Sequence, residues 1–224
     1  MKKLFSTLAV AALTALSLNA QIKEGTITYN MTLQGLSPEE AAMMGDMESV
    51  MSFKTGKSLT EASSIMGSST FLFDETGMLM LQDQMGNKTG MKQTKEEMEK
   101  EAAKEKTADP KIEYTDETKT IAGYECKKAI VTVVTKDKKE EKMDVWYSDK
   151  FENTNKEGKG QGQDFRKGLK GMPFEYGMSL GTLKIKFVAK SVSTDPVPDS
   201  KFVLSTEGYK MMTMDEMKSM RGGK

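Results

Sequence analysis

Gly25-Thr26-Ile27-Thr28-Tyr29-Asn30-Met31-Thr32-Leu33 alternates apolar and polar side chains without a break. Successive side chains of a β-strand point to opposite sides, so the apolar residues from Ile27 to Leu33 share one face and the polar ones share the other. One dry face and one wet face are typical of an antiparallel sheet. The stretch therefore predicts a strand whose apolar side packs on a core.

The same pattern recurs along most of the chain. Short connections with turn residues, such as Lys54-Thr55-Gly56-Lys57 and Asp74-Glu75-Thr76-Gly77, separate the segments. They favour an antiparallel meander, because parallel strands need crossovers of about a dozen residues or more. The further strands are expected at Ser49 to Thr55, Lys57 to Ile65, Ser69 to Asp74, Met78 to Gln84, Lys88 to Thr94, Lys128 to Thr135, Glu141 to Tyr147, Met172 to Leu180 and Thr182 to Val192.

Three short helices are predicted by capping boxes, in which a hydroxyl at the cap and a glutamate three residues later satisfy free N–H groups. These boxes are Ser37-Pro38-Glu39-Glu40, Thr94-Lys95-Glu96-Glu97 and Thr213-Met214-Asp215-Glu216. The fold class expected is therefore mainly β (α+β). The middle helix is almost all charge and alanine, so we expect a helical or mobile connection over residues 95–109. Residues 153–164 are rich in Gly, Lys, Asn and Gln and predict a flexible loop.

The first twenty residues have the composition of an export signal. Lys2 and Lys3 precede an apolar run from Leu4 to Leu18, and Ala20 stands at the expected cleavage point. The run is shorter than the roughly 18 to 20 residues that span a bilayer, and no second run follows. Residues 1–20 are thus predicted to be a signal peptide, with an uncleaved anchor as the alternative. Residues 21–224 are expected to form one exported domain, periplasmic or extracellular, without a transmembrane span.

Composition excludes several classes of function. The chain has no histidine, so imidazole-based acid–base catalysis and most zinc sites are ruled out. Its 33 basic and 33 acidic residues are not clustered with aromatics, which argues against a nucleic-acid partner. The single cysteine, Cys126, cannot form an internal disulfide and is expected to be buried. Gly177-Met178-Ser179-Leu180-Gly181 matches a nucleophile elbow, but a strand follows it, so we expect a hairpin there. We expect neither an enzyme nor a cofactor.

Methionine is unusually frequent, with 20 in the chain. Thioethers can bind Cu(I), which prefers soft ligands. Methionine is also a flexible filler of cores and of apolar surfaces that accept varied ligands. Two stretches are dense in it: Met43, Met44, Met47 and Met51, and then Met211, Met212, Met214, Met217 and Met220.

Four segments in the second half of the chain are distinctive in their order rather than as single motifs: Thr118 to Ala129, Val145 to Ser148, Leu169 to Tyr176 and Phe202 to Met212. Together they resemble a known family of exported Bacteroidota proteins, the domain of unknown function 4412, which is related to GLPGLI-type proteins. Such domains are similar to the half-barrels of periplasmic lipoprotein carriers, which implies one strongly curved antiparallel sheet with short helices covering its concave face.

The leading hypothesis is a non-enzymatic binding protein for a lipid, an acyl chain or a lipoprotein segment. Trp146, Phe174, Tyr176 and Met178 are the expected lining residues, since apolar side chains on alternating strands can face a groove. A second hypothesis is a Cu(I)-handling protein. A third is an envelope interaction protein without a small ligand. The candidate Cu(I) ligands are Met43, Met47, Met51, Met214 and Met217.

Overall fold

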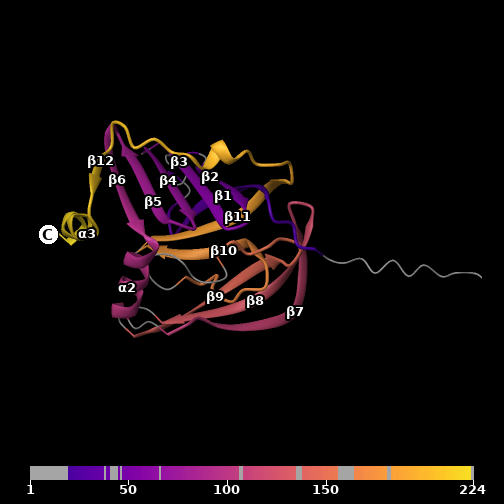
Figure 1. Ribbon diagram of the computed structural model, residues 1–224. Helices are drawn as coiled ribbons and strands as arrows, with labels where there is room; N and C mark the ends of the chain where they lie inside the picture. Colours follow the sequence, from indigo (N-terminus) through magenta and orange to yellow (C-terminus); the bar gives the residue numbers. More distant parts are fainter. Residues whose placement is uncertain are drawn as a thin grey trace, which may run out of the picture.

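The computed structural model describes residues 20–37, 39–40, 45, 47–65, 67–105, 108–134, 138–155, 164–180 and 183–222. Within them, twelve strands form a single sheet in the order β12-β6-β5-β4-β3-β2-β1-β11-β10-β9-β8-β7 (Figure 1). All neighbouring strands are antiparallel except β12 and β6. The predicted mainly-β class and antiparallel meander are confirmed.

Short connections join most of the consecutive strands, as the sequence predicts, whereas β9 and β10 are joined by a longer segment. In the described residues the α-helices are α2 (Lys95–Glu105) and α3 (Met214–Gly222), with a 3₁₀ turn, η1, at Asp199–Phe202. The strands are β1 (Gly25–Gln34), β2 (Met47–Lys54), β3 (Lys57–Ser64), β4 (Gly67–Asp74), β5 (Gly77–Gln84), β6 (Asn87–Thr94), β7 (Lys111–Ile121), β8 (Tyr124–Val134), β9 (Glu140–Ser148), β10 (Met172–Leu180), β11 (Leu183–Ser193) and β12 (Lys210–Met212).

The sheet consists of two meanders joined by one strand pair. Strands β1 to β6 follow one another in space, and so do β7 to β11. β1 pairs on one side with β2 and on the other with β11, which closes the gap between the two halves. The sheet is open and curved, so that β7–β10 lie below β2–β6 in the view of Figure 1.

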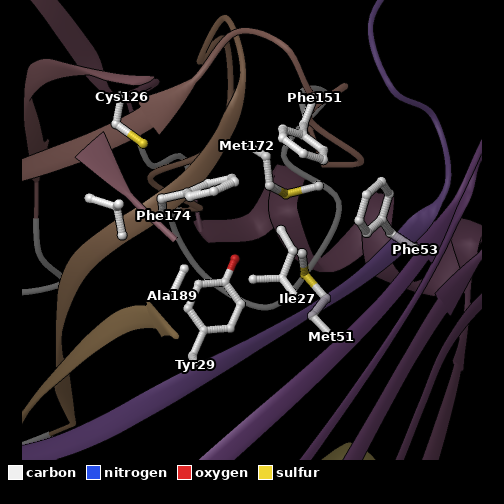
Figure 2. Close-up of a cluster of buried hydrophobic side chains, with 10 residues drawn as sticks. Ile27, Tyr29, Met51, Phe53, Cys126, Phe151, Met172, Phe174 and Ala189 are labelled. Atoms are coloured by element: carbon white, nitrogen blue, oxygen red, sulfur yellow. The ribbon is translucent and has the colours of Figure 1, made fainter. Parts of the chain in front are cut away.

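The largest buried cluster lies where β1 meets the second meander. Ile27 and Phe174 are fully buried, and Tyr29 is 2% exposed. The Tyr29 hydroxyl donates a 2.8 Å hydrogen bond to the carbonyl oxygen of Pro173 in β10, so its polar end is satisfied. Figure 2 shows Tyr29 and Ile27 on one side of this cluster, with Phe174, Met172 and Phe151 facing them. The apolar face predicted for the first strand is the face that forms the core.

Tight turns fix the register of several hairpins. Met85 and Gly86, between β5 and β6, have φ values of 53° and 88°, and Ala122 and Gly123, between β7 and β8, have 48° and 82°. Two consecutive residues with positive φ are typical of the type I′ turn, whose twist matches that of paired strands. Each turn therefore sets which residues of its two strands face each other.

The C-terminal segment wraps around the β6 edge. It passes over the top of β2–β6 in Figure 1 and ends in β12 and α3. Val197 and Phe202 pack on Leu59, Leu72, Leu79 and Leu81. β12 then pairs with β6, with Met212 opposite Met91. Both faces of the β3–β6 region are consequently covered by apolar side chains.

The capping boxes form as predicted. The Thr94 N–H donates to Glu97 Oε2 at 2.8 Å, and the Glu97 N–H donates to Thr94 Oγ1 at 3.2 Å, where α2 begins. The same pair of bonds joins Thr213 and Glu216 at α3. Ser37 and Glu40 also exchange both bonds, but most of the helix expected there lies outside the described residues.

Two strands, β7 and β12, are not predicted from the sequence. β7 is one of the two edge strands of the sheet, and most of its side chains are exposed on both faces, so no alternation marks it. Charged residues are typical of such edges because they discourage pairing with another chain. β12 has three residues and forms only because its segment reaches the β6 edge.

No helix in the described parts of the chain combines the length and the apolar character needed to cross a membrane.

Replacing Ile27 with alanine tests the core. The side chain is fully buried in the cluster that joins the two meanders. We expect Ile27→Ala to lower the free energy of unfolding by about 2–5 kcal/mol. Thr28→Ala, on the opposite face of the same strand, should cost no more than about 1 kcal/mol. Urea unfolding of the two variants checks this, and equal losses would contradict the assignment of faces.

Candidate functional site

The apolar face of β1 continues beyond the core. Met31 lies opposite Met47 of β2 and Phe187 of β11, and Phe187 lies opposite Tyr176 of β10. Directly opposite residues share one face of a sheet, so these four side chains form a row across four strands. The next row consists of Leu33, Ile185 and Met178. We call the two rows together the apolar strip.

Burial decreases from the core towards this strip. Along β1, Ile27 is fully buried and Tyr29 is 2% exposed, whereas Met31 and Leu33 are only half-buried. Along β10, Phe174 is fully buried and Met178 is 39% exposed. The strip is therefore apolar surface that the described residues leave partly accessible.

Aromatic rings mark the boundary between core and strip. Tyr176 and Phe187 stack with centroids 4.8 Å apart and planes at 7°. Tyr29 meets the edge of Tyr176 at 5.9 Å, and Phe165 lies 5.0 Å from the same ring. Burial raises the pKa of Tyr176 to about 12, in spite of the opposing effect of Arg166. The phenol is therefore a neutral hydrogen-bonding group at physiological pH.

An ion pair stands beside these rings. Arg166 donates to Asp164 through Nε at 2.9 Å and through Nη2 at 2.7 Å, and Asn155 Nδ2 also donates to this carboxylate. Burial opposes the guanidinium charge, but Asp164 more than offsets it and raises the pKa of Arg166. Asn153 holds the adjoining chain by donating to the carbonyl oxygens of Arg166 and Leu169. The pair is thus a fixed, internally neutralised dipole next to the strip.

A hollow of about 210 Å³ adjoins the strip at Met31 and Met47. Small side chains such as Ala62 and Ser69 form much of its wall, together with Gln82. Its polar groups are uncharged, so an apolar chain entering it would not have to displace water from an ion. Strip and hollow together form the candidate binding site.

A larger hollow of about 710 Å³ has a different chemistry. It is lined by Lys54, Lys57, Glu24 and Asp199, among others. Lys54 is 3.3 Å from Asp199 and 3.6 Å from Glu24, and Lys57 is 3.8 Å from Asp199. These charges neutralise one another at a partly exposed surface. The hollow is therefore lined by ion pairs and is poorly suited to an apolar ligand.

The four predicted lining residues are not brought together. Tyr176 and Met178 lie in the strip, and Phe174 lies in the core beneath it. Trp146 points away from its neighbours Val145 and Tyr147, which are buried in a separate cluster. Lys119 Nζ lies 4.1 Å above the Trp146 ring.

The charged groups around Trp146 are also paired. Glu175 accepts from Lys119 at 2.7 Å and lies 3.0 Å from Lys186 Nζ. Burial by itself would raise the pKa of Glu175, but the bonds from the two lysines lower it. Trp146 therefore packs against the edge of the main core cluster, beneath Lys119, and is not part of the apolar strip.

The candidate Cu(I) ligands are also separated. Met47 and Met51 lie on β2, on the face that carries the core and the strip. Met214 and Met217 pack against methionines of β5 and β6 instead. Met43 lies outside the described residues.

Sequence reasoning missed Met31, Leu33, Ile185 and Phe187 as lining residues. Alternation in Thr182 to Val192 does place Ile185 and Phe187 on one face. Nothing local shows that this face continues the apolar face of β1, because the two strands come from opposite ends of the domain.

Groups that could carry catalysis are poorly placed. Ser179 lies in β10 opposite Lys184, in an antiparallel pair rather than at a strand-to-helix elbow. Cys126 is fully buried, as expected, and burial raises the pKa of its thiol to about 12. The described residues contain no group of three or more Cys, Asp or Glu side chains that could hold a metal ion.

The buried thiol gives a pH test. The unfolded chain releases the Cys126 proton near pH 9, whereas the folded chain keeps it up to about pH 12. Its contribution to stability is complete below pH 9 and decreases as the pH rises towards 12. Between about pH 8 and about pH 10, we expect wild type to lose about 1.4 kcal/mol more than Cys126→Ala. Urea unfolding at both pH values measures this, and equal losses would mean that the thiol ionises alike in both states.

Comparison with known proteins gives a family. The model of the family described as a domain of unknown function (DUF4412) matches residues 24–191. No curated protein matches the chain. A solved structure of PNGF-II is 16% identical with a TM-score of 0.48, over 88% of this chain but only 33% of that one. LprF from Mycobacterium bovis is 12% identical with a TM-score of 0.31, over 78% of this chain and 88% of its own.

Proposed function

Because this chain belongs to the DUF4412 family, whose description assigns no activity, we propose from its own geometry that it is a non-enzymatic protein that binds an acyl chain. The acyl chain belongs to a lipid or to the lipid anchor of a lipoprotein. The observation that carries this proposal is the apolar strip, which extends the core across four strands and stays half-buried. Apolar surface of this kind gains about 25 cal/mol per Å² when a ligand covers it.

The polar groups beside the strip favour a ligand with a small polar end. Tyr176, protonated up to a pKa of about 12, supplies a neutral hydroxyl. The Arg166–Asp164 pair adds a dipole with no net charge. An apolar chain along Met31 and Leu33 would place its polar end near these groups. The strip offers no acid–base pair or nucleophile, which supports binding rather than catalysis.

The remaining sequence expectations belong to the same proposal. Residues 1–20 support export to the periplasm or cell surface, where such a carrier would meet lipids and lipoproteins. The sequence resemblance supports an origin in the Bacteroidota and a relation to GLPGLI-type proteins. Met98 of α2 belongs to one buried cluster with Met80 and Met91, and register puts these two on the same face as Ile27. This supports the proposal that short helices cover the concave face.

Uncharged polar substitutions in the strip test the proposal. We expect Met31→Asn and Leu33→Asn each to weaken binding of a fluorescent fatty-acyl probe about tenfold or more, since each removes apolar contact worth about 1.5–3 kcal/mol. Thr32→Asn lies between them on the other face and should leave the affinity unchanged. Fluorescence titration of the purified protein gives the dissociation constants.

Two results would overturn the proposal. One is that protein purified from its host carries no lipid by mass spectrometry and does not bind the probe, as an interaction protein without a small ligand would behave. The other is that Thr32→Asn weakens binding as much as the strip variants, which would place the probe elsewhere.

A further inference from the structure

Strand β5 separates two kinds of apolar side chain onto its two faces. Its sequence Met78-Leu79-Met80-Leu81 alternates thioether and aliphatic residues. All four are buried, at 5–9% exposure. Leu79 and Leu81 face the segment with Val197 and Phe202, whereas Met78 and Met80 face α2 and α3. Alternation along a strand gives each face its own chemistry.

The methionine face draws on five elements of the fold. It holds six buried methionines, each no more than 8% exposed, and half-buried Met214, Phe71 and Phe73 lie against them. Among the residues that the structure describes, the buried cluster on the opposite face contains no methionine. The six come from β5, β6, α2, β12 and α3: Met78, Met80, Met91, Met98, Met212 and Met217.

Packing alone does not account for this separation. Both clusters are buried to a similar degree, and both lie between the sheet and the C-terminal segment. Methionine used only as a flexible filler would serve either face. Met211 does lie on the leucine face, with its sulfur beside Gly90 and Leu81, but it is 41% exposed. The buried thioethers gather on the other face, and the chemical property that distinguishes a thioether from leucine is soft coordination.

Strand register aligns three of these side chains. Met80 of β5 lies directly opposite Met91 of β6, and Met91 lies directly opposite Met212 of β12. Neighbouring strands are about 4.8 Å apart, so the three Cβ atoms form one short row on a common face. Flexible thioethers at that spacing can turn their sulfur atoms towards one ion, while Met98 and Met217 close the site from the helices.

We propose that the Met80–Met91–Met212 row, covered by Met98 and Met217, binds a soft monovalent cation, Cu(I) or its analogue Ag(I). The row consists of neutral sulfur ligands. Such ligands do not compete with water for Mg²⁺, Ca²⁺ or Zn²⁺. The cation is bound without change of oxidation state. It would link β12 to β5 and β6, and thus fasten the C-terminal segment to the sheet. The site is separate from the apolar strip.

Cu(I) titration of the full chain under anaerobic, reducing conditions, against a chromophoric Cu(I) chelator, tests the site. We expect one ion per chain, and X-ray absorption should show sulfur ligands only. Met80→Leu, Met91→Leu and Met212→Leu should each weaken binding by more than about 100-fold, since even changes outside the ligand sphere of a metal cost 10–100-fold. Leucine nearly conserves volume, so these variants should fold, which circular dichroism checks.

Matched controls separate this site from other methionines. Met47→Leu and Met51→Leu, on β2, and Met85→Leu, 93% exposed at a hairpin tip, should bind Cu(I) like wild type. The proposal is overturned if the wild-type chain does not bind, if the row variants bind normally, or if the controls lose binding equally. Acyl-probe binding should be unchanged in the row variants, so failure of one proposal is distinguishable from failure of the other.

Discussion

The two halves of the sheet are held together by the pairing of β1 with β11. Local hairpins satisfy the inner strands of each meander, but β1 at the end of one meander and β11 at the end of the other would each have an edge of free N–H and C=O groups if they did not pair. Joining these edges removes both liabilities and makes one continuous sheet. The register, with a bulge between Thr28 and Tyr29, puts Tyr29 opposite Ala189 and Met31 opposite Phe187. A shift of one residue would turn the apolar face of β1 away from that of β11.

The same pairing explains why core and strip are continuous. Because β1 is central, its apolar face contributes to both halves, from fully buried Ile27 to half-buried Leu33. Because the sheet curves, the second meander covers the Ile27 end of this face. The described residues cover the Leu33 end less completely. The C-terminal segment protects the opposite edge, where β12 pairs with β6. A protein built in this way has one packed end, one accessible apolar end and an edge closed by its own terminus.

The local sequence predicts individual strands and helices better than it predicts which of them lie side by side in the fold. Hairpin strands from Ser49 to Thr94 and both well-described capping boxes were found because alternation, turns and caps act over a few residues. No apolar–polar alternation marks β7, because this edge strand is mostly exposed on both faces. Trp146 was taken for a lining residue because its aromatic character is visible in sequence, whereas its position under Lys119 is not.

The amino-acid sequence is enough to predict that the chain is mainly β and antiparallel, that it has no histidine chemistry, and that the first strand has one apolar face. These properties follow from composition and from a two-residue period, which each segment carries alone. Three further features become visible only in the folded chain: β11 lies beside β1, the apolar row continues from Met31 to Phe187, and methionines from five elements gather on one face of β5. Such neighbours are separated by most of the chain, and their meeting depends on the free energy of the whole sheet rather than on any local preference.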